Sequence, residues 1–214
     1  MLERDFDLVI FDCDGTLVDS EPITVKVLVD YVAEFGLTIQ YDEAISLFVG
    51  RDMPGIVKVL EGRIGKPLPS EFVEEFRNRQ SAALRRDLQE IAGASELLNA
   101  MQKSFCVASN APQYKISINL NVTGLDKFFT PERTFSAYDI NVWKPEPDLF
   151  LHAATKMKVA PDRCVVIEDS IMGIDAGLAA GMQVIGYAQD LNARPLSDVR
   201  FVDSLVDLIP VLAG

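Results

Sequence analysis

The chain has 214 residues, 49% of them hydrophobic, which suffices for one large domain or for a core domain that carries a smaller one. Acidic residues outnumber basic residues by 32 to 20, which gives a formal net charge of -12. This charge argues against nucleic acid and anionic membranes as the main partners, because both require a basic surface. It does not exclude an anionic small molecule, since a bound cation and a few basic side chains can reverse the local field.

The first predicted element is a strand at residues 8–11, where the run Leu-Val-Ile-Phe leads directly into Asp12. A helical segment follows, with no convincing strand before about residue 91. It contains two apolar stripes at helical spacing, Leu28, Tyr31, Val32 and Phe35, then Phe72, Val73 and Phe76. A helical block of about seventy residues is too long for an ordinary connection. It predicts an all-α cap domain at 18–91, inserted into a core domain formed by 1–17 and 92–214.

After this insertion, strands and helices alternate. Strands are predicted at 105–108, 164–167 and 184–187, with 134–136 as a weaker candidate, and helices at 94–101, 146–157 and 173–180. Gly181, directly after the last of these helices, suits a left-handed C-cap. Continuous apolar runs are typical of strands buried on both faces. The pattern therefore predicts an α/β fold with a Rossmann-like, doubly wound parallel sheet covered by helices.

Polar side chains follow three of the predicted strands. Asp12 ends the first strand, Ser109 follows the second, and Glu168-Asp169 follows the strand at 164–167. Because ligands bind at the carboxyl ends of the strands in such sheets, we expect these side chains to meet in one crevice. Several carboxylates in one crevice would repel one another unless a cation neutralised them. Ligands that are all oxygen favour magnesium over zinc.

The segment Asp12-Cys13-Asp14-Gly15-Thr16-Leu17 has the composition of a phosphoryl-transfer site. An aspartate at a strand end can attack phosphorus and form an aspartyl-phosphate. A second carboxyl group two residues later, Asp14, suits an acid–base partner beside the leaving oxygen. Gly15 allows a sharp turn and a close approach of the backbone to phosphate. We expect Cys13 to be a buried apolar side chain and not a reactive thiol.

The chain resembles the haloacid dehalogenase (HAD) superfamily of phosphotransferases, which carries the D-x-D-G-T pattern, and within it the β-phosphoglucomutase-like branch with a helical cap. Four motifs in order carry the resemblance over essentially the whole chain. They are Asp12 to Leu17, Ser109-Asn110, Trp143-Lys144-Pro145, and Glu168-Asp169-Ser170 with Gly173, Ala176 and Gly181. The resemblance implies a magnesium-dependent phosphatase with a HAD-like core.

The resemblance also implies a role for each matching residue. Asp12 attacks phosphorus and binds the metal ion, and Asp14 protonates the leaving alkoxide, activates water and binds the metal through its backbone carbonyl. Lys144 neutralises charge on the transferred group. The remaining expected contacts are to phosphate from Gly15, Thr16, Ser109 and the Asn110 backbone, and to metal from Asp169 and from Glu168, directly or through water.

Each assignment has a structural alternative that the sequence leaves open. Asp14 and Ser109-Asn110 could be turn-forming residues, and Lys144 could be a solvated lysine before a helix. Glu168-Asp169-Ser170 could form the N-cap of the following helix, alone or in addition to binding metal.

In this family the cap closes over the site and sets specificity. The candidate specificity segment contains Gly50 and Arg51, and Arg51 could bind a carboxylate or second phosphate of the substrate. Relatives often have a lysine where Val49 stands, so one expected cation is missing. A solvated arginine in a turn is the alternative.

The expected substrate is a small phosphorylated metabolite, a sugar phosphate or sugar-acid phosphate. Several core segments resemble the bacterial 6-phosphogluconate phosphatases, including residues 11–21, 109–112 and 138–145. A mutase of the β-phosphoglucomutase type is the alternative enzyme, but Pro22-Ile23 stands where the mutases carry a histidine. A phospho-accepting signalling module is the alternative from another class; such modules lack D-x-D-G-T.

The three cysteines, Cys13, Cys106 and Cys164, are far apart and form neither a C-x-x-C pair nor a disulfide pattern. Together with a charged start and no membrane-length apolar run, they favour a cytoplasmic protein. We expect no nucleic-acid or membrane partner, and a monomer or weak dimer.

Overall fold

The computed structural model describes residues 5–48, 51–187 and 199–212. The chain forms two compact units, one made of Met1–Asp19 with Gln89–Gly214 and the other of Ser20–Leu88. The sequence placed the boundaries at 17/18 and 91/92. Residues at both junctions lie with the first unit, because Val18 bridges to Glu90 and the Ile91 N–H donates to the Leu17 carbonyl at 2.9 Å. We call the first the core unit and the second the helical unit.

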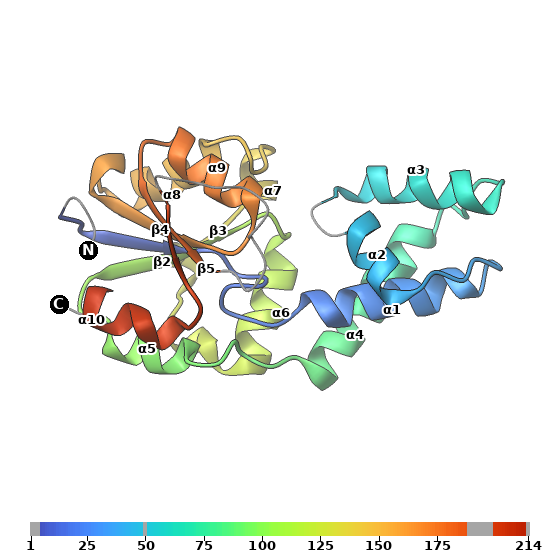
Figure 1. Ribbon diagram of the computed structural model, residues 1–214, viewed down its shortest axis with the longest axis horizontal. Helices are drawn as coiled ribbons and strands as arrows, with labels where there is room; N and C mark the ends of the chain where they lie inside the picture. Colours follow the sequence, from blue (N-terminus) through green and yellow to red (C-terminus); the bar gives the residue numbers. More distant parts are fainter. Residues whose placement is uncertain (1–4, 49–50, 188–198, 213–214) are drawn as a thin grey trace. The chain divides into compact units, whose positions relative to one another are not determined.

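The core unit is built on a parallel sheet. Among the described residues its strands are β1 (Leu8–Phe11), β2 (Ser104–Ser109), β3 (Thr134–Ser136), β4 (Cys164–Glu168), β5 (Gln183–Tyr187) and β6 (Arg200–Val202). They lie in the order β3-β2-β1-β4-β5-β6, every neighbouring pair being parallel (Figure 1). The five predicted strands are confirmed. β6 was missed because it has only three residues, two of them exposed.

The register of the sheet aligns the ends of its central strands. Phe11 in β1 pairs with Val107 in β2 on one side and with Ile167 in β4 on the other. The chain moves outward from β1 in both directions, to β2 and β3 and to β4 and β5. The strand order therefore switches direction beside β1, and a ligand-binding crevice is expected where the carboxyl ends of β1 and β4 meet.

Helices cover both faces of this sheet. They are α5 (Ala94–Ala100), α6 (Gln113–Thr123), α7 (Ala137–Ile140), α8 (Asp148–Met157), α9 (Ile171–Ala179) and α10 (Ile209–Leu212). Short 3-10 turns lie at Leu125–Lys127, Pro131–Arg133, Pro161–Arg163 and Leu205–Leu208. Figure 1 shows α8 and α9 on one face and α5 and α10 on the other. The three predicted helices of the core are confirmed within a few residues at each end, and Gly181 is left-handed (φ 74°) as predicted.

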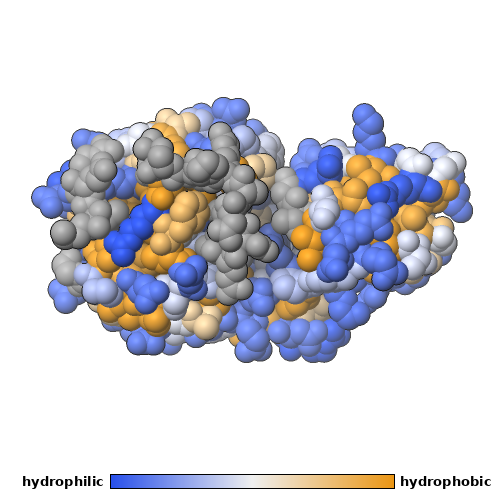
Figure 2. All heavy atoms as spheres, viewed as in Figure 1, coloured by the Kyte–Doolittle hydropathy of each residue, from blue (hydrophilic) through white to orange (hydrophobic). Residues whose placement is uncertain are grey.

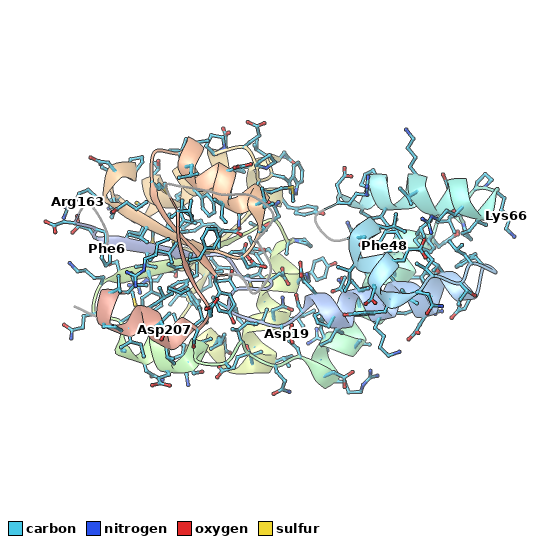
Figure 3. All side chains as sticks on the ribbon, in the orientation of Figure 1. Phe6, Asp19, Phe48, Lys66, Arg163 and Asp207 are labelled. Carbon is cyan, nitrogen blue, oxygen red and sulfur yellow. The ribbon has the colours of Figure 1, made fainter. Side chains whose placement is uncertain are left out.

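The apolar core of this unit lies between β1, β2 and β4 and the helices α8 and α9. Leu8, Ile10, Val166, Leu149 and Phe150 belong to it and are completely buried. Asp19, where the chain passes out of the core unit, lies at the carboxyl end of the sheet (Figure 3). Phe6 and Arg163, which precede β1 and β4, lie at the opposite end.

The helical unit contains α1 (Glu21–Ala33), α2 (Tyr41–Phe48), α3 (Met53–Ile64) and α4 (Phe72–Asp87), and its described residues form no strand. Both predicted apolar stripes supply buried residues to its core, Leu28, Tyr31 and Val32 from α1 and Phe72 and Phe76 from α4. The rings of Tyr31 and Phe72 stack with their centroids 4.8 Å apart. This unit therefore has a hydrophobic core of its own.

In the space-filling view, hydrophilic residues cover much of the outer edge of each unit, and apolar residues are visible within the face of each unit (Figure 2). None of the helices formed by the described residues has the length and apolar character needed to cross a membrane.

Candidate active site

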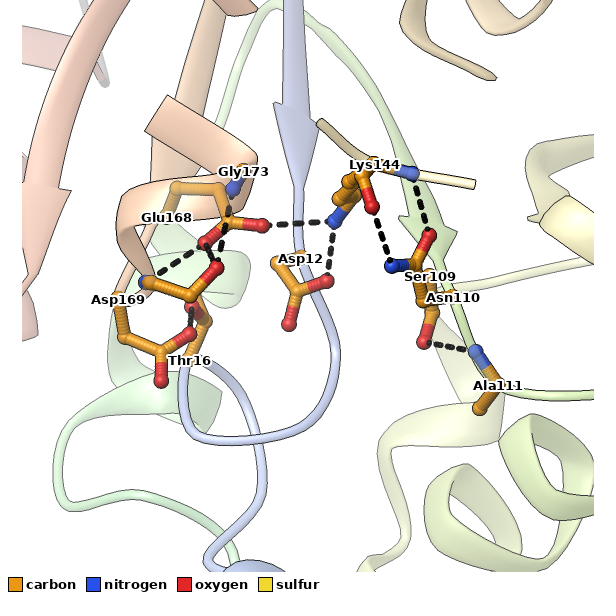
Figure 4. A network of polar contacts seen from close by, with 10 residues as sticks. Asp12, Thr16, Ser109, Asn110, Ala111, Lys144, Glu168, Asp169 and Gly173 are labelled. Atoms are coloured by element: carbon orange, nitrogen blue, oxygen red, sulfur yellow. Dashed lines mark hydrogen bonds and ion pairs between the residues drawn. The ribbon is translucent and has the colours of Figure 1, made fainter. Parts of the chain in front are cut away.

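A buried lysine links the ends of two neighbouring strands. Asp12 directly follows β1, Glu168 is the last residue of β4, and Lys144 lies in the segment between α7 and α8. The Lys144 Nζ lies 2.5 Å from Asp12 Oδ1 and 2.7 Å from Glu168 Oε1 (Figure 4). All three residues are nearly inaccessible, with 6%, 1% and 5% exposure for Asp12, Glu168 and Lys144. Two carboxyl groups thus share one cation away from bulk water.

Burial makes this group of charges electrostatically sensitive. Desolvation raises the pKa of Asp12 to about 8, and the Glu168 charge adds to this rise, although Lys144 opposes it. Burial lowers the pKa of Lys144, but attraction to Asp12 and Glu168 outweighs it, and the net direction is upward. Lys144 therefore stays cationic, and a second cation would favour the ionised form of Asp12.

Asp169 packs against the loop that follows β1. The Thr16 hydroxyl donates to Asp169 Oδ1 at 2.9 Å. Gly15 has a left-handed backbone (φ 86°), and a Cβ on it would lie 2.1 Å from Asp169 Oδ2. Any side chain at position 15 would collide with this carboxylate. The missing side chain thus lets residues more than 150 positions apart meet (Figure 4).

Glu168 is held from the other side by Ser170. The backbone N–H and the hydroxyl of Ser170 both donate to Glu168 Oε2 at 2.8 Å. The same hydroxyl accepts from the Gly173 N–H at 3.0 Å and so caps α9. A Cβ on Gly173 would lie 1.7 Å from Glu168 Oε1. The N-cap alternative is therefore correct for Ser170, and the cap also positions Glu168.

Asn110, in the segment after β2, forms hydrogen bonds to the backbone of Lys144. Asn110 Oδ1 accepts from the Lys144 N–H at 2.9 Å, and Asn110 Nδ2 donates to the Lys144 carbonyl at 3.3 Å. The Ser109 hydroxyl is buried and accepts from the Ala111 N–H at 3.0 Å. We expected Asn110 to act through its backbone; the structure adds a side-chain role, which is to place Lys144 (Figure 4).

Asp14 meets two side chains of α6. Lys115 Nζ and Asn119 Nδ2 lie 2.8 and 2.9 Å from Asp14 Oδ1. Burial lowers the pKa of Lys115, but the charge and hydrogen bond of Asp14 outweigh it, so the lysine stays cationic. Burial, followed by the charges of Asp14 and Asp12, raises the pKa of Cys13 well above its usual range, so this thiol stays protonated.

The predicted residues of the core unit thus gather at one end of the sheet. Gly50, like Val49, lies outside the described residues. Arg51 belongs to the helical unit, is exposed, and donates from Nε to the Leu47 carbonyl at 2.9 Å. No three His, Cys, Asp or Glu side chains within the described ranges are grouped so as to hold a metal ion. The predicted metal ligands therefore stay a prediction.

Sequence reasoning missed Lys115 and Asn119. One signal could have identified them, because they lie four residues apart and so share a face of a helix that begins just after Ser109-Asn110. The lysine is also in the first turn, where the helix dipole disfavours a cation. Such a residue needs an explanation other than helix stability.

Comparisons with known proteins cover most of the chain. The family model described as haloacid dehalogenase-like hydrolase matches residues 9–187. The 6-phosphogluconate phosphatase of Escherichia coli (strain K12) is 36% identical over 191 residues, which cover 89% of this chain and 86% of that protein. A HAD family hydrolase from Deinococcus radiodurans R1, solved with bound phosphate and sodium, is 32% identical with a TM-score of 0.80, covering 99% of this chain and 96% of that one. A candidate β-phosphoglucomutase from Thermotoga maritima shares the fold at 22% identity, with a TM-score of 0.80 and coverage of 97% and 98%.

Proposed function

The chain belongs to the haloacid dehalogenase-like hydrolases and is a phosphoric monoester hydrolase, and on this basis we propose that it hydrolyses a small phosphorylated sugar or sugar acid through an aspartyl-phosphate. The observation that carries the proposal is the buried contact of Lys144 with Asp12 at the end of β1. A carboxylate held beside a cation in a dry site is suited to attack an anionic phosphoryl group, because the lysine offsets the repulsion.

Each step falls to a residue of the core unit. In the first step a carboxylate oxygen of Asp12 bonds to phosphorus, the ester oxygen leaves, and Asp14 gives that oxygen a proton. In the second step Asp14 takes a proton from water, the water oxygen attacks phosphorus, and the bond to Asp12 breaks. Lys144 fixes the orientation of Asp12 and neutralises the transferred group, and Asn110 fixes Lys144.

Phosphate oxygens would be bound by the Ser109 hydroxyl and by backbone N–H groups at Asn110 and at Gly15-Thr16. The Thr16 hydroxyl is already bonded to Asp169, so a phosphate contact from Thr16 falls to its backbone. Gly15 permits this approach because it has no side chain.

The donors at the site are all oxygen, the type that magnesium prefers, although the side chains of the described residues are not grouped as a metal cluster. Asp12 and Asp169 offer carboxylate oxygens at the ends of neighbouring strands, Asp14 offers a backbone carbonyl, and Glu168 offers a further carboxyl, direct or through water. Burial raises the pKa of Asp12 to about 8, and a divalent cation would keep this carboxyl ionised at neutral pH. The ion would supply charge neutralisation for the phosphoryl group.

The helical unit would act as a cap that selects the substrate. Arg51 is engaged only through Nε in the described contacts, and its terminal nitrogens suit a bidentate contact to a substrate carboxylate. Together with the 36% identity to 6-phosphogluconate phosphatase, this favours a sugar-acid phosphate. The three cysteines are buried and unpaired, which supports a cytoplasmic location.

The test is phosphate release from a panel of sugar phosphates, sugar-acid phosphates and nucleotides with magnesium present. We expect steady release without a bisphosphate activator, highest for a sugar-acid phosphate such as 6-phosphogluconate, and loss of activity in excess chelator. Turnover that needs a bisphosphate activator would favour a mutase, and full activity in chelator would contradict the magnesium requirement.

A further inference from the structure

Helix α6 carries two side chains whose contacts converge on one oxygen of the acid–base residue. Lys115 and Asn119 are four residues apart, so they lie on the same face of α6, and both donate to Asp14 Oδ1 at 2.8 and 2.9 Å. Both residues are about 100 positions away from the D-x-D-G-T segment in sequence. The contacts of Lys115 and Asn119 with Asp14 therefore depend on tertiary packing and not on a local turn.

Neither side chain is where helix or core stability alone would place it. Lys115 is in the first turn of α6, where the helix dipole disfavours a cation. Asn119 is completely buried, and within the described part of the chain its Oδ1 has no hydrogen-bond partner. An unsatisfied buried acceptor destabilises the fold. The amide is thus held in an orientation in which it bonds to Asp14 and to the Cys13 sulfur, while its own carbonyl oxygen is left unpaired.

We infer that Lys115 and Asn119 are positioning residues that hold the Asp14 carboxyl in one orientation for proton transfer, an inference that rests on the acid–base role proposed above. The two contacts hold Oδ1 against α6 and thereby fix the direction in which the Asp14 carboxyl group points.

The experiment compares two substrates of nearly the same shape, phenyl phosphate and p-nitrophenyl phosphate, at pH 7 with saturating magnesium. Phenoxide is the poorer leaving group and needs a proton from Asp14, whereas p-nitrophenoxide leaves largely without one. The value of kcat/KM reports the step in which the ester bond breaks. In Lys115→Met we expect kcat/KM to fall by about tenfold or more for phenyl phosphate and by less than about threefold for p-nitrophenyl phosphate.

Three further variants separate positioning from folding. Lys115→Arg keeps a cationic donor and should recover most of the phenyl phosphate activity, and Lys127→Met, which removes an exposed lysine beyond α6, should change neither value. Asn119→Leu keeps the number and branching of the side-chain heavy atoms and removes the unpaired acceptor. It should leave the Tm unchanged or higher and yet show the same selective loss with phenyl phosphate.

Asp14→Asn is the reference for the outcome. If Asp14→Asn shows the selective loss and the Lys115 and Asn119 variants do not, the positioning inference is wrong and the proposed function stands. If Asp14→Asn affects both substrates equally, the acid–base role itself fails. Equal losses for both substrates in Lys115→Met, with a lowered Tm, would assign the lysine a structural role only.

Discussion

The core unit and the helical unit differ in where their charged side chains lie. In the core unit Asp12, Glu168 and Lys144 are buried together. In the helical unit the described ion pairs are at the surface, as for Lys26 with Asp30, whose side chains are 70% and 63% exposed. Buried charges lose hydration and rarely add net stability, and exposed pairs add little. The burial of these three charged side chains in the core unit is therefore not explained by fold stability, and it is typical of a catalytic site.

The strongest way to break this comparison is to remove the carboxylate of Asp12. Asp12→Asn should lower kcat by about a thousandfold or more, because an amide is a far poorer nucleophile. The Tm should not fall, since the neutral side chain still fits and no longer repels Glu168. A phosphate-release assay measures kcat, and a thermal melt measures the Tm. Retention of more than about a tenth of wild-type activity would contradict a covalent intermediate on Asp12.

The second test compares one cation from each unit. Lys144→Met leaves Asp12 and Glu168 buried without their cation, and it should lower activity by about a hundredfold and the Tm by about 10 °C. Arg79→Met removes a partly exposed arginine that pairs with Glu34 and Glu75 and lies over the Tyr31 ring. Its Tm should fall by no more than about 3 °C, with activity unchanged. Equal Tm losses would mean that the contrast between the units is wrong.

A smaller effect is expected from the side chain that holds Lys144. Asn110→Ala removes both contacts to the Lys144 backbone but keeps its own backbone N–H for phosphate. We expect kcat to fall by about tenfold with little change in KM, because the lysine acts mainly in the transition state. A change in KM alone would assign the Asn110 side chain to phosphate binding instead.

The helical unit is tested through substrate choice. Arg51→Ala should raise KM for 6-phosphogluconate by about fivefold and leave KM for p-nitrophenyl phosphate unchanged, since only the first carries a carboxylate. Arg63→Ala is the matched control, because Arg63 pairs with Glu43 in the same unit. Equal effects of Arg51→Ala on both substrates would show that Arg51 does not bind the substrate carboxylate.

The smallest effect concerns an exposed pair of the core unit. Arg163 donates two hydrogen bonds to Asp7, and these bonds, with its charge, hold the pKa of Asp7 below the usual value. A carboxyl with a lowered pKa stabilises the fold above its unfolded pKa, and this contribution is lost as the pH falls through the folded pKa. Asp7→Asn should therefore lower the Tm by less than about 2 °C at pH 7, and the two melting curves should converge below about pH 4. A constant difference across that range would exclude the ion pair as its cause.

The sequence predicted most of the sheet because the strands are continuous apolar runs, which can be recognised without knowing the tertiary structure. It missed β6, whose exposed Phe201 and short length give no such signal. It also predicted which residues end β1, β2 and β4, since strand order and the ligand edge follow from general rules of parallel sheets. Asp12, Ser109 and Glu168 were found in this way.

The individual side-chain contacts at this edge could not be predicted. The spacing of Lys115 and Asn119 indicates a shared helix face but not that this face meets Asp14, and nothing near Asn110 indicates that its amide binds the Lys144 backbone. These contacts depend on how α6 and the segment after α7 pack against the sheet, which periodicity does not encode. The Ser170 cap was visible as a pattern, but its second bond, to Glu168, was not.

The two chain segments that lead out of the core unit and back into it lie against each other. The Asp19 N–H donates to the Gln89 carbonyl at 3.1 Å, and Val18 bridges to Glu90. A short turn between Asp19 and Gln89 could therefore close the chain without disturbing the sheet. An enzyme with such a junction can acquire a new specificity by grafting a different insert at this point, while the nucleophile, the acid–base residue and their supports are inherited unchanged.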